Sequence, residues 1–218
     1  MDTPDEHARR LARASGDGDD PLAWFERLYS QVEDGAAVAP WDRGGPHPLI
    51  AEWADARALD GTGRRALVIG AGLGQDAEYL SSRGFDTTAF DLAATAIKLA
   101  AQRFPGSRVD YRVADLLEPP AAWRGAFDLV LESLTVQSMP PELHEAAIAR
   151  VGELVAPGGT LLVVATGRDE DAAAAGPPWP LTRAEIDAFA AGGLEVERIE
   201  ELRDASVFRW RAQYRRVS

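Results

Sequence analysis

In this chain of 218 residues, glycines or acids directly follow several short apolar runs. A glycine-rich turn, Gly70 to Gly74, follows the first of several short apolar runs, and single acids follow the next three runs. These acids are Asp91, Asp115 and Glu132. A glycine-rich turn before a helix lets a ligand approach the backbone and offers it the amides of the helix N-terminus. Asp91 stands 21 residues beyond Gly70, where a carboxylate at a strand end can accept both hydroxyls of a ribose. The pattern therefore predicts a nucleoside site.

The kind of nucleoside follows from the glycine spacing and from the charge. Dinucleotide binding calls for G-x-G-x-x-G, and Gln75 stands where the third glycine would be, which disfavours a nicotinamide oxidoreductase. The formal net charge is −12, from 23 Lys plus Arg and 35 Asp plus Glu. This charge disfavours a pyrophosphate, a nucleic acid or an anionic membrane as the partner. S-adenosyl-L-methionine suits an acidic site better, because it carries a sulfonium and an ammonium against one carboxylate.

The predicted cofactor contacts follow predicted strands. Asp115 is placed to accept a hydrogen bond from the adenine amino group, and Leu92 and Leu116 are placed to sandwich the ring. The set predicted from this pattern is Gly70, Ala71, Gly72, Gly74, Asp91, Leu92, Asp115, Leu116 and Glu132. The alternative is a tight turn with unrelated surface acids. It would have to explain why all three acids, Asp91, Asp115 and Glu132, fall at strand ends.

Short strands alternating with helices must position these groups. The apolar runs predict strands at residues 66–69, 87–90, 109–113, 127–131 and 160–165, and then at about 194–200 and 207–215. This alternation predicts an α/β fold with a Rossmann-like, doubly wound, mostly parallel seven-stranded sheet. Residues 208–215 alternate strictly between apolar and polar types, so the C-terminal strand is predicted to be an antiparallel edge strand. Ligands bind such sheets beyond the carboxyl ends of the strands.

Three stretches of the chain resemble the thiopurine S-methyltransferase superfamily of class I S-adenosylmethionine-dependent methyltransferases. Pro40 to Leu49 matches the P-W-D-x-G-x-x-x-P entry motif of its halide and thiol methyltransferase branch. Arg65 to Asp76 matches the branch pattern R-x-L-V-P-G-C-G-x-G-x-D, with Ile69 and Ala71 in place of Pro and Cys. Gly176 to Trp179 resembles its G-G-P-P-Y. The resemblance extends from about residue 40 to the C-terminus.

The resemblance implies methyl transfer from S-adenosyl-L-methionine to a small molecule, with S-adenosyl-L-homocysteine as the second product. It implies that Trp41 packs near the cofactor and that Asp91 holds the ribose. It also implies that the N-terminal helix carrying Trp24, Phe25 and Tyr29 folds over the cofactor, although such an aromatic stripe is more often part of a core.

One departure from the branch concerns the acceptor. The branch carries several aromatic residues after the acid of the fourth strand, whereas the run from Glu132 to Met139 has none. This disfavours a halide and leaves a larger or more polar acceptor as open as a simple thiol. We expect a thiol acceptor, with an O- or N-methyltransferase of a secondary metabolite as the alternative. A non-catalytic nucleoside-binding module is the distant alternative.

Candidate residues for acceptor chemistry are few. Methyl transfer by direct displacement needs alignment and exclusion of water rather than a covalent residue. The entry-loop residue His47 is the candidate general base, which a phenol or an amine would need more than a thiol. Its alternative is a solvated loop histidine. The predicted acceptor contacts are Tyr29, Ser133, Gln137 and Trp179. With no cysteine and three histidines, no metal site is predicted.

The chain is predicted to have three parts. Residues 1–20 are polar without periodicity and are expected to form a flexible arm. Residues 21–60 are expected to form a helical lid and the entry loop, and residues 61–218 the methyltransferase domain. The N-terminus lacks a signal-peptide pattern, and no apolar run reaches the length of a membrane span. We therefore expect a soluble, unprocessed, cytoplasmic monomer or homodimer that uses no nucleic acid and no membrane.

Overall fold

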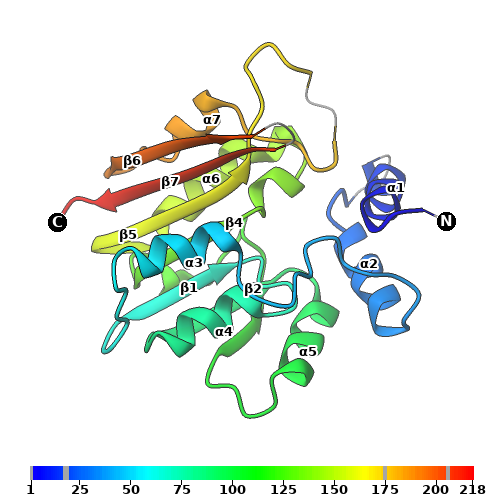
Figure 1. Cartoon of the computed structure of the whole chain (residues 1–218), viewed down its shortest axis with the longest axis horizontal. Helices are drawn as coiled ribbons and strands as arrows, with labels where there is room; N and C mark the ends of the chain where they lie inside the picture. Colours follow the sequence, from blue (N-terminus) through cyan, green and yellow to red (C-terminus); the bar gives the residue numbers. More distant parts are fainter. Residues whose placement is uncertain (1, 17–19, 174–175, 205–206) are drawn as a thin grey trace.

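The structure, a computed structural model, describes residues 2–16, 20–173, 176–204 and 207–218. It is built around one seven-stranded sheet with the order β3-β2-β1-β4-β5-β7-β6 (Figure 1). The strands are β1 (Arg65–Ile69), β2 (Asp86–Asp91), β3 (Asp110–Val113), β4 (Phe127–Ser133), β5 (Val155–Thr166), β6 (Leu194–Arg203) and β7 (Phe208–Arg216). Strands β1 to β5 pair in parallel, and β7 is antiparallel to both β5 and β6. The predicted α/β fold with a mostly parallel sheet is confirmed.

Helices cover both faces of this sheet. They are α1 (Pro4–Gly16), α2 (Trp24–Glu33), α3 (Pro48–Asp55), α4 (Gln75–Ser82), α5 (Ala94–Arg103), α6 (Pro141–Glu153) and α7 (Arg183–Ala188), with short 3₁₀ turns η1 (Ala121–Trp123) and η2 (Val136–Ser138). Successive residues of β1 enter different cores: Leu67 packs with the side chains of α6 and α7, and Val68 with those of α3 and α4. This is why β1 is apolar at every position from Ala66 to Ile69. A capping box formed by Thr182 and Glu185 opens α7.

Strand β7 corrects one detail of the predicted topology. It is antiparallel, as predicted, but it lies between β5 and β6, so β6 rather than the C-terminal strand forms the edge. The alternation that predicted an edge has another cause. One face of β7 packs Trp210 and Tyr214 into the core, and the other makes polar contacts, with Gln213 accepting a hydrogen bond of 2.8 Å from Trp53 Nε1.

Residues Pro4–Gly16 form helix α1, although the sequence predicted a flexible arm over residues 1–20. Thr3 and Glu6 cap its start, since the Thr3 backbone N–H donates to the Glu6 carboxylate at 2.8 Å. Ala8 and Ala12 are buried with residues of α2. Alanines add little to a hydrophobic pattern, so the periodicity is hard to detect in the sequence. Within the predicted arm, residues 1 and 17–19 lie outside the described residues.

Helix α2 and the entry loop lie at the end of the sheet where the turns after β1 and β2 emerge (Figure 1). Tyr29 of α2 packs with Leu73, which follows β1, and with Ala93, which follows β2. This end of the sheet is where ligands bind in open parallel folds. Within the described ranges, no helix has the length and apolar composition needed to cross a membrane.

Candidate active site

A cavity lies beyond the carboxyl ends of the parallel strands, and its walls include α1, α2 and the entry loop. Most residues predicted as a site meet there. From the predicted set it is lined by Tyr29, Trp41, His47, Gly70, Ala71, Gly72, Asp91, Leu92, Asp115, Leu116, Ser133 and Gln137. The predicted residues Gly74, Glu132 and Trp179 are not part of its lining. The fold thus brings together residues that lie more than a hundred positions apart in the sequence.

The glycine turn after β1 leaves the backbone open on the cavity side. Gly70 and Gly72 have φ angles of +64° and +52°, in the left-handed region that glycine adopts without steric cost. A Cβ atom on Gly72 would lie 3.1 Å from the Tyr29 hydroxyl and 3.4 Å from Trp41 Nε1. The absence of a side chain at this position therefore keeps the turn accessible to a ligand.

Asp91 joins the ends of β1 and β2. One carboxylate oxygen accepts a hydrogen bond from the Gly72 N–H and the other from the Ala93 N–H, each at 2.9 Å. Burial raises the pKa of Asp91 to about 6, against the opposing effect of these backbone hydrogen bonds. Each oxygen keeps a further lone pair, so the carboxylate can still accept the two hydroxyls of a ribose.

The adenine contacts predicted beside Asp91 also line the cavity. Asp115 has one carboxylate oxygen 2.8 Å from the Leu117 backbone nitrogen, which fixes the side chain at the end of β3. Leu116 is buried and Leu92 is partly exposed, and both face the cavity. Together they offer apolar surface beside an acceptor group, as adenine binding requires.

Four aromatic side chains from α2 and the entry loop form a wall that we call the aromatic wall: Trp24, Phe25, Tyr29 and Trp41. Trp41 Nε1 donates to the Tyr29 hydroxyl at 2.7 Å, and the Trp24 and Phe25 ring centroids are 3.9 Å apart. Trp24 Nε1 is buried without a hydrogen-bond partner among the described residues. The aromatic residues that the segment after β4 lacks are thus supplied by the N-terminal part of the chain.

His47 caps α3, and this contact limits its use as a base. Its Nδ1 accepts a hydrogen bond from the Leu49 N–H at 3.2 Å, so the remaining proton of the neutral ring is on Nε2. Burial, together with the charges of Arg43 and Arg209, lowers the pKa of His47 to about 4. At neutral pH the ring is uncharged and a weak base. The general-base role stays a prediction, and this geometry favours the capping role.

Asp76 lines the cavity although it was not predicted as a contact. Its carboxylate accepts a hydrogen bond of 2.8 Å from the His47 N–H, and burial raises its pKa. The sequence signal that could have identified Asp76 was its place in the motif that contains Gly70, Gly72 and Gly74. The residue holds the entry loop against the first turn of α4.

Glu132 is at the end of β4, but its side chain turns away from the cavity. It is fully buried, and its Oε1 accepts hydrogen bonds from the Thr135 and Val136 N–H groups at 2.8 and 2.9 Å. The geometry thus makes it a cap for η2 rather than a cofactor contact. Gly74, with φ +89°, is the N-cap of α4, and a Cβ on it would lie 2.4 Å from the Tyr111 hydroxyl. Both residues shape the site without lining it.

Trp179 was predicted to wall the acceptor pocket, but the neighbouring Pro177 and Pro178 do so instead. The Trp179 N–H donates to the Gln137 carbonyl at 2.6 Å. The Gln137 side chain donates in turn to the Thr166 hydroxyl at 3.2 Å. The proline-rich loop is therefore attached to η2 and to the end of β5, and it closes one side of the cavity.

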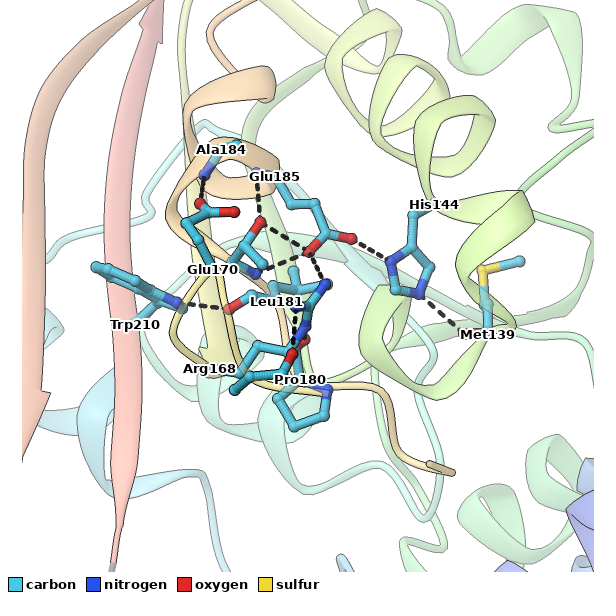
Figure 2. Close-up of polar contacts among 11 residues, drawn as sticks. Met139, His144, Arg168, Glu170, Pro180, Leu181, Ala184, Glu185 and Trp210 are labelled. Atoms are coloured by element: carbon cyan, nitrogen blue, oxygen red, sulfur yellow. Dashed lines mark hydrogen bonds and ion pairs between the residues drawn. The ribbon is translucent and has the colours of Figure 1, made fainter. Parts of the chain in front are cut away.

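A buried polar network supports this side of the cavity, as Figure 2 shows. His144 of α6 bridges the Glu185 carboxylate at 2.6 Å and the Met139 carbonyl at 2.9 Å. Arg168 donates to the Pro180 carbonyl at 2.9 Å and lies 3.6 Å from Glu185. Hydrogen bonds from His144 and from the Thr182 N–H lower the pKa of Glu185 to about 2, although burial opposes them. Since Met139 lines the cavity, the network fixes one wall of the site.

These features fit S-adenosyl-L-methionine. Asp91 would accept the ribose hydroxyls, Leu92 and Leu116 would contact the adenine, and the open backbone from Gly70 to Gly72 would face the methionine part. When bound, this cofactor supplies an electrophilic methyl carbon on a sulfonium. The chain's own contribution is to orient an acceptor in line with that carbon and to exclude water with the aromatic wall.

Comparison with characterised sequences agrees with this chemistry. The chain is 28% identical over 172 residues to the probable thiol methyltransferase 2 of Arabidopsis thaliana, covering 75% of this chain and 74% of that protein. It is 28% identical over 204 residues to thiocyanate methyltransferase 1 of Brassica oleracea, covering 91% and 83%. It is also 32% identical over 150 residues to a ubiquinone biosynthesis O-methyltransferase of Xanthomonas axonopodis pv. citri, covering 64% and 62%.

Solved structures share the fold. The 1,6-didemethyltoxoflavin N1-methyltransferase of Burkholderia thailandensis, solved with S-adenosylhomocysteine, superposes with a TM-score of 0.67 at 20% identity, covering 100% of this chain and 92% of that one. The N-methyltransferase NodS of Bradyrhizobium japonicum, also with S-adenosylhomocysteine, gives a TM-score of 0.64 at 19% identity, covering 97% and 99%.

The family-level match covers most of the chain. The sequence model of the thiopurine S-methyltransferase (TPMT) family matches residues 33–218, which include the entry loop, the glycine turn and the whole sheet. The fold and the cavity at the carboxyl ends of its strands agree with that match. The chain therefore belongs to the thiopurine S-methyltransferase family and is an S-adenosyl-L-methionine-dependent methyltransferase.

Proposed function

We propose that this methyltransferase acts on the sulfur of a small-molecule thiol. The observation that carries the proposal is the combination of an aromatic wall with a weak base. His47 has a pKa of about 4, and the Asp76 and Asp91 carboxylates accept hydrogen bonds from backbone amides. An acceptor that ionises in part on its own near neutral pH, as a thiol with a pKa of about 8.5 does, needs no stronger base. The names of the plant relatives support the same acceptor class.

In the proposed reaction the acceptor thiolate attacks the methyl carbon opposite the leaving sulfur. A carbon–sulfur bond forms as the bond to the sulfonium breaks, and its electron pair returns to the leaving sulfur. The products are a methyl thioether and S-adenosyl-L-homocysteine, and the two opposite charges disappear together. A water-poor aromatic cavity favours such a charge-cancelling step.

The residues that we propose to contact the cofactor all line the cavity. They are Trp41, Gly70, Ala71, Gly72, Asp91, Leu92, Asp115 and Leu116. We assign acceptor contacts to Tyr29, Ser133 and Gln137. Ser133 ends β4 and Gln137 lies in η2, on the side of the glycine turn away from Asp91. The cofactor and the acceptor would therefore meet near Gly70.

The test is an acceptor panel of sulfide, aryl thiols, phenols and amines, assayed with methyl-labelled S-adenosyl-L-methionine. The proposal expects the label to be recovered in thioethers at higher kcat/KM than in ethers or methylamines. Preferential labelling of a phenol or an amine would instead establish the O- or N-methyltransferase alternative, which the 32% identical O-methyltransferase relative favours. Binding of the cofactor without turnover of any acceptor would point to a non-catalytic module.

The same proposal covers the cellular location, the partners and the oligomeric state of the enzyme. We propose a cytoplasmic enzyme, and the net charge of −12 disfavours nucleic acid and an anionic membrane as its partners. We propose a monomer or a homodimer. Light scattering of the purified chain distinguishes these two states, and a larger assembly would contradict both.

A further inference from the structure

The buried side chain of His144 lies between two groups that can only accept hydrogen bonds. Its Nδ1 lies 2.6 Å from the Glu185 carboxylate, and its Nε2 lies 2.9 Å from the Met139 carbonyl oxygen (Figure 2). A neutral imidazole carries a single N–H, so it can donate to only one of these oxygens. The other nitrogen would then present its lone pair to an oxygen. Both hydrogen bonds are therefore made only when the ring is an imidazolium, with a proton on each nitrogen.

The proton between the two side chains belongs to the ring rather than to Glu185. The second oxygen of this carboxylate, Oε2, accepts hydrogen bonds from the Thr182 N–H at 2.8 Å and from the Thr182 hydroxyl at 3.0 Å. The Arg168 guanidinium lies 3.6 Å from the same oxygen. Burial opposes ionisation of Glu185, yet the hydrogen bonds from His144 and Thr182 bring its pKa down to about 2. An ionised carboxylate has no proton to give to Nδ1.

The charges that face His144 favour the second ring proton. Glu185 approaches it from α7, and Glu132, at the end of β4, acts on it through space. Arg168 lies on the far side of Glu185. The segments η2 and β5, which also pack against α6, contain no charged residue. The other charged side chains of α6 and α7 are exposed or paired with one another: Glu142, Glu145, Arg150, Glu153, Arg183 and Asp187.

This imidazolium closes a ring of contacts beside the cavity. From Glu185 the ring continues to Arg168, whose Nε donates to the Pro180 carbonyl at 2.9 Å. The N–H of the adjacent Trp179 donates to an η2 carbonyl at 2.6 Å. The chain then runs from η2 directly into Met139, which completes the ring. Two segments that are about forty positions apart are thus held together by His144 and its partners.

Both of these segments line the cavity on its acceptor side. We call them the acceptor wall, defined as residues 137–139 and 177–178, all of which are part of the lining. The side chain of His144 is not part of the lining, so it can affect a bound acceptor only through this wall.

We propose that His144 is a positioning residue that acts as an imidazolium and holds the acceptor wall in place against the methyl acceptor. The inference rests on the proposed function in placing the acceptor beside this wall, and it holds for a sulfur, oxygen or nitrogen acceptor alike. Loss of one ring proton removes one of the two hydrogen bonds and loosens the wall. The KM of the acceptor then rises with pH, while the cofactor half of the site around Asp91 is unaffected.

Glu185→Gln is the discriminating variant. Its amide oxygen can keep the Thr182 contacts, while its amide nitrogen can donate to Nδ1 of a neutral ring whose Nε2 proton still reaches Met139. The wall then stays in place with a single ring proton. The wild-type acceptor KM, taken as a ratio to that of Glu185→Gln, should rise about tenfold between pH 5.5 and pH 8.5, because a charge-assisted hydrogen bond is lost. Ionisation of the acceptor cancels in this ratio. Glu145→Gln removes an exposed acid next to His144 and is the matched control, which should follow the wild type.

His144→Gln and NMR spectroscopy report on the ring itself. The variant can supply at most one of the two contacts, so at pH 6 it should raise the acceptor KM about tenfold and leave the Kd of S-adenosyl-L-homocysteine unchanged. Long-range ¹H–¹⁵N spectra of the histidine-labelled full chain show the protonation of both ring nitrogens, and the signals missing in His144→Gln identify the residue. The wild-type ring should lose its second proton in the pH range where the KM ratio rises. If it keeps both protons up to pH 8.5, the ratio should stay flat and His144→Gln alone should raise KM.

Three results would overturn the positioning role. The first is a ring with a single proton over the whole pH range. The second is loss of a ring proton with no change in the KM ratio. The third is an equal loss of acceptor and S-adenosyl-L-homocysteine affinity in His144→Gln, which would make the residue a general support of the fold.

Failure of this inference is distinguishable from failure of the proposed function. The spectra need no acceptor, and KM is measured with whichever compound of the acceptor panel is methylated. A phenol or an amine as the best acceptor, with a KM ratio that follows the ring proton, would refute sulfur and keep the positioning role. Turnover of a thiol with a ratio that ignores the ring proton would keep sulfur and refute the positioning role.

Discussion

The Asp91 carboxylate accepts a hydrogen bond of 2.9 Å from the backbone N–H of Gly72, so the acid that ends β2 is attached to the turn that follows β1. This contact joins the two parts of the predicted nucleoside site before any ligand binds. A ligand that reaches both groups meets a site with little conformational freedom left to lose, which favours affinity.

Gly72→Ala is expected to weaken cofactor binding more than it weakens the fold. The left-handed conformation destabilises an alanine by roughly 1–2 kcal/mol, and the alanine Cβ would crowd Tyr29 and Trp41 at 3.1 and 3.4 Å. Gly35→Ala is the matched control, because Gly35 has φ +70° with no atom within 4 Å of a Cβ. Thermal unfolding should shift similarly in both variants, while calorimetry should show lost S-adenosyl-L-homocysteine affinity in Gly72→Ala alone. Equal affinities would show that the turn does not contact the cofactor.

His47 variants separate capping from catalysis. Asparagine is a good N-cap, so His47→Asn should keep both the stability and the kcat of the wild type, whereas His47→Ala should lose about 1 kcal/mol of stability. Denaturant unfolding and thiol methylation assays measure the two effects. A fall in kcat of a hundredfold or more in a stable His47→Asn enzyme would mean that the imidazole is the general base after all.

Glu132 is expected to make the fold less stable as the pH rises. Burial raises its pKa from 4.5 to about 7, so between these pH values the folded chain keeps a proton that the unfolded chain has released. Stability from this group is complete below pH 4.5 and is lost as the pH rises towards 7. In Glu132→Gln the amide oxygen can still accept from Thr135 and Val136, and the amide does not titrate.

Urea unfolding of both proteins at pH 5 and pH 8 tests this expectation. The wild type should lose stability relative to Glu132→Gln between the two pH values. Other titrating groups are common to both proteins and cancel in the difference. An unchanged difference would show that Glu132 is ionised in the fold over this whole range.

The sheet and the cofactor half of the site were predictable from the sequence. The central strands β1, β4 and β5 are largely apolar and buried on both faces, so length and composition identify them. The glycine turn and Asp91 depend only on strand order and on where each strand ends. Neither needs knowledge of packing, and the structure brings both to one cavity.

The rest depended on tertiary contacts that no local pattern reports. Helix α1 is held by alanines against α2, and β7 presents a polar face because Trp53 and its neighbours cover it. Glu132 has the same position at a strand end as Asp91, but its carboxylate bonds to η2 amides. Whether such a side chain turns towards the cavity is set by the turn that follows the strand.

The acceptor half of the site was the least predictable. Trp179 and the prolines before it are adjacent in sequence, but only the prolines face the cavity. Arg43 and Arg209 are 166 positions apart, and only the placement of β7 beside β5 brings them to the same cavity.

Calorimetry of S-adenosyl-L-homocysteine binding to wild type, Asp91→Ala and Asp86→Ala tests the central assignment most directly. Asp86 is an exposed acid at the other end of β2, so its variant controls for lost charge. Asp91→Ala should lose about 2 to 4 kcal/mol of binding free energy, roughly thirtyfold to several hundredfold in Kd, because two charge-assisted hydrogen bonds to the ribose are removed. Asp86→Ala should bind like wild type. Wild-type affinity in a folded Asp91→Ala variant would contradict the placement of the cofactor in this cavity.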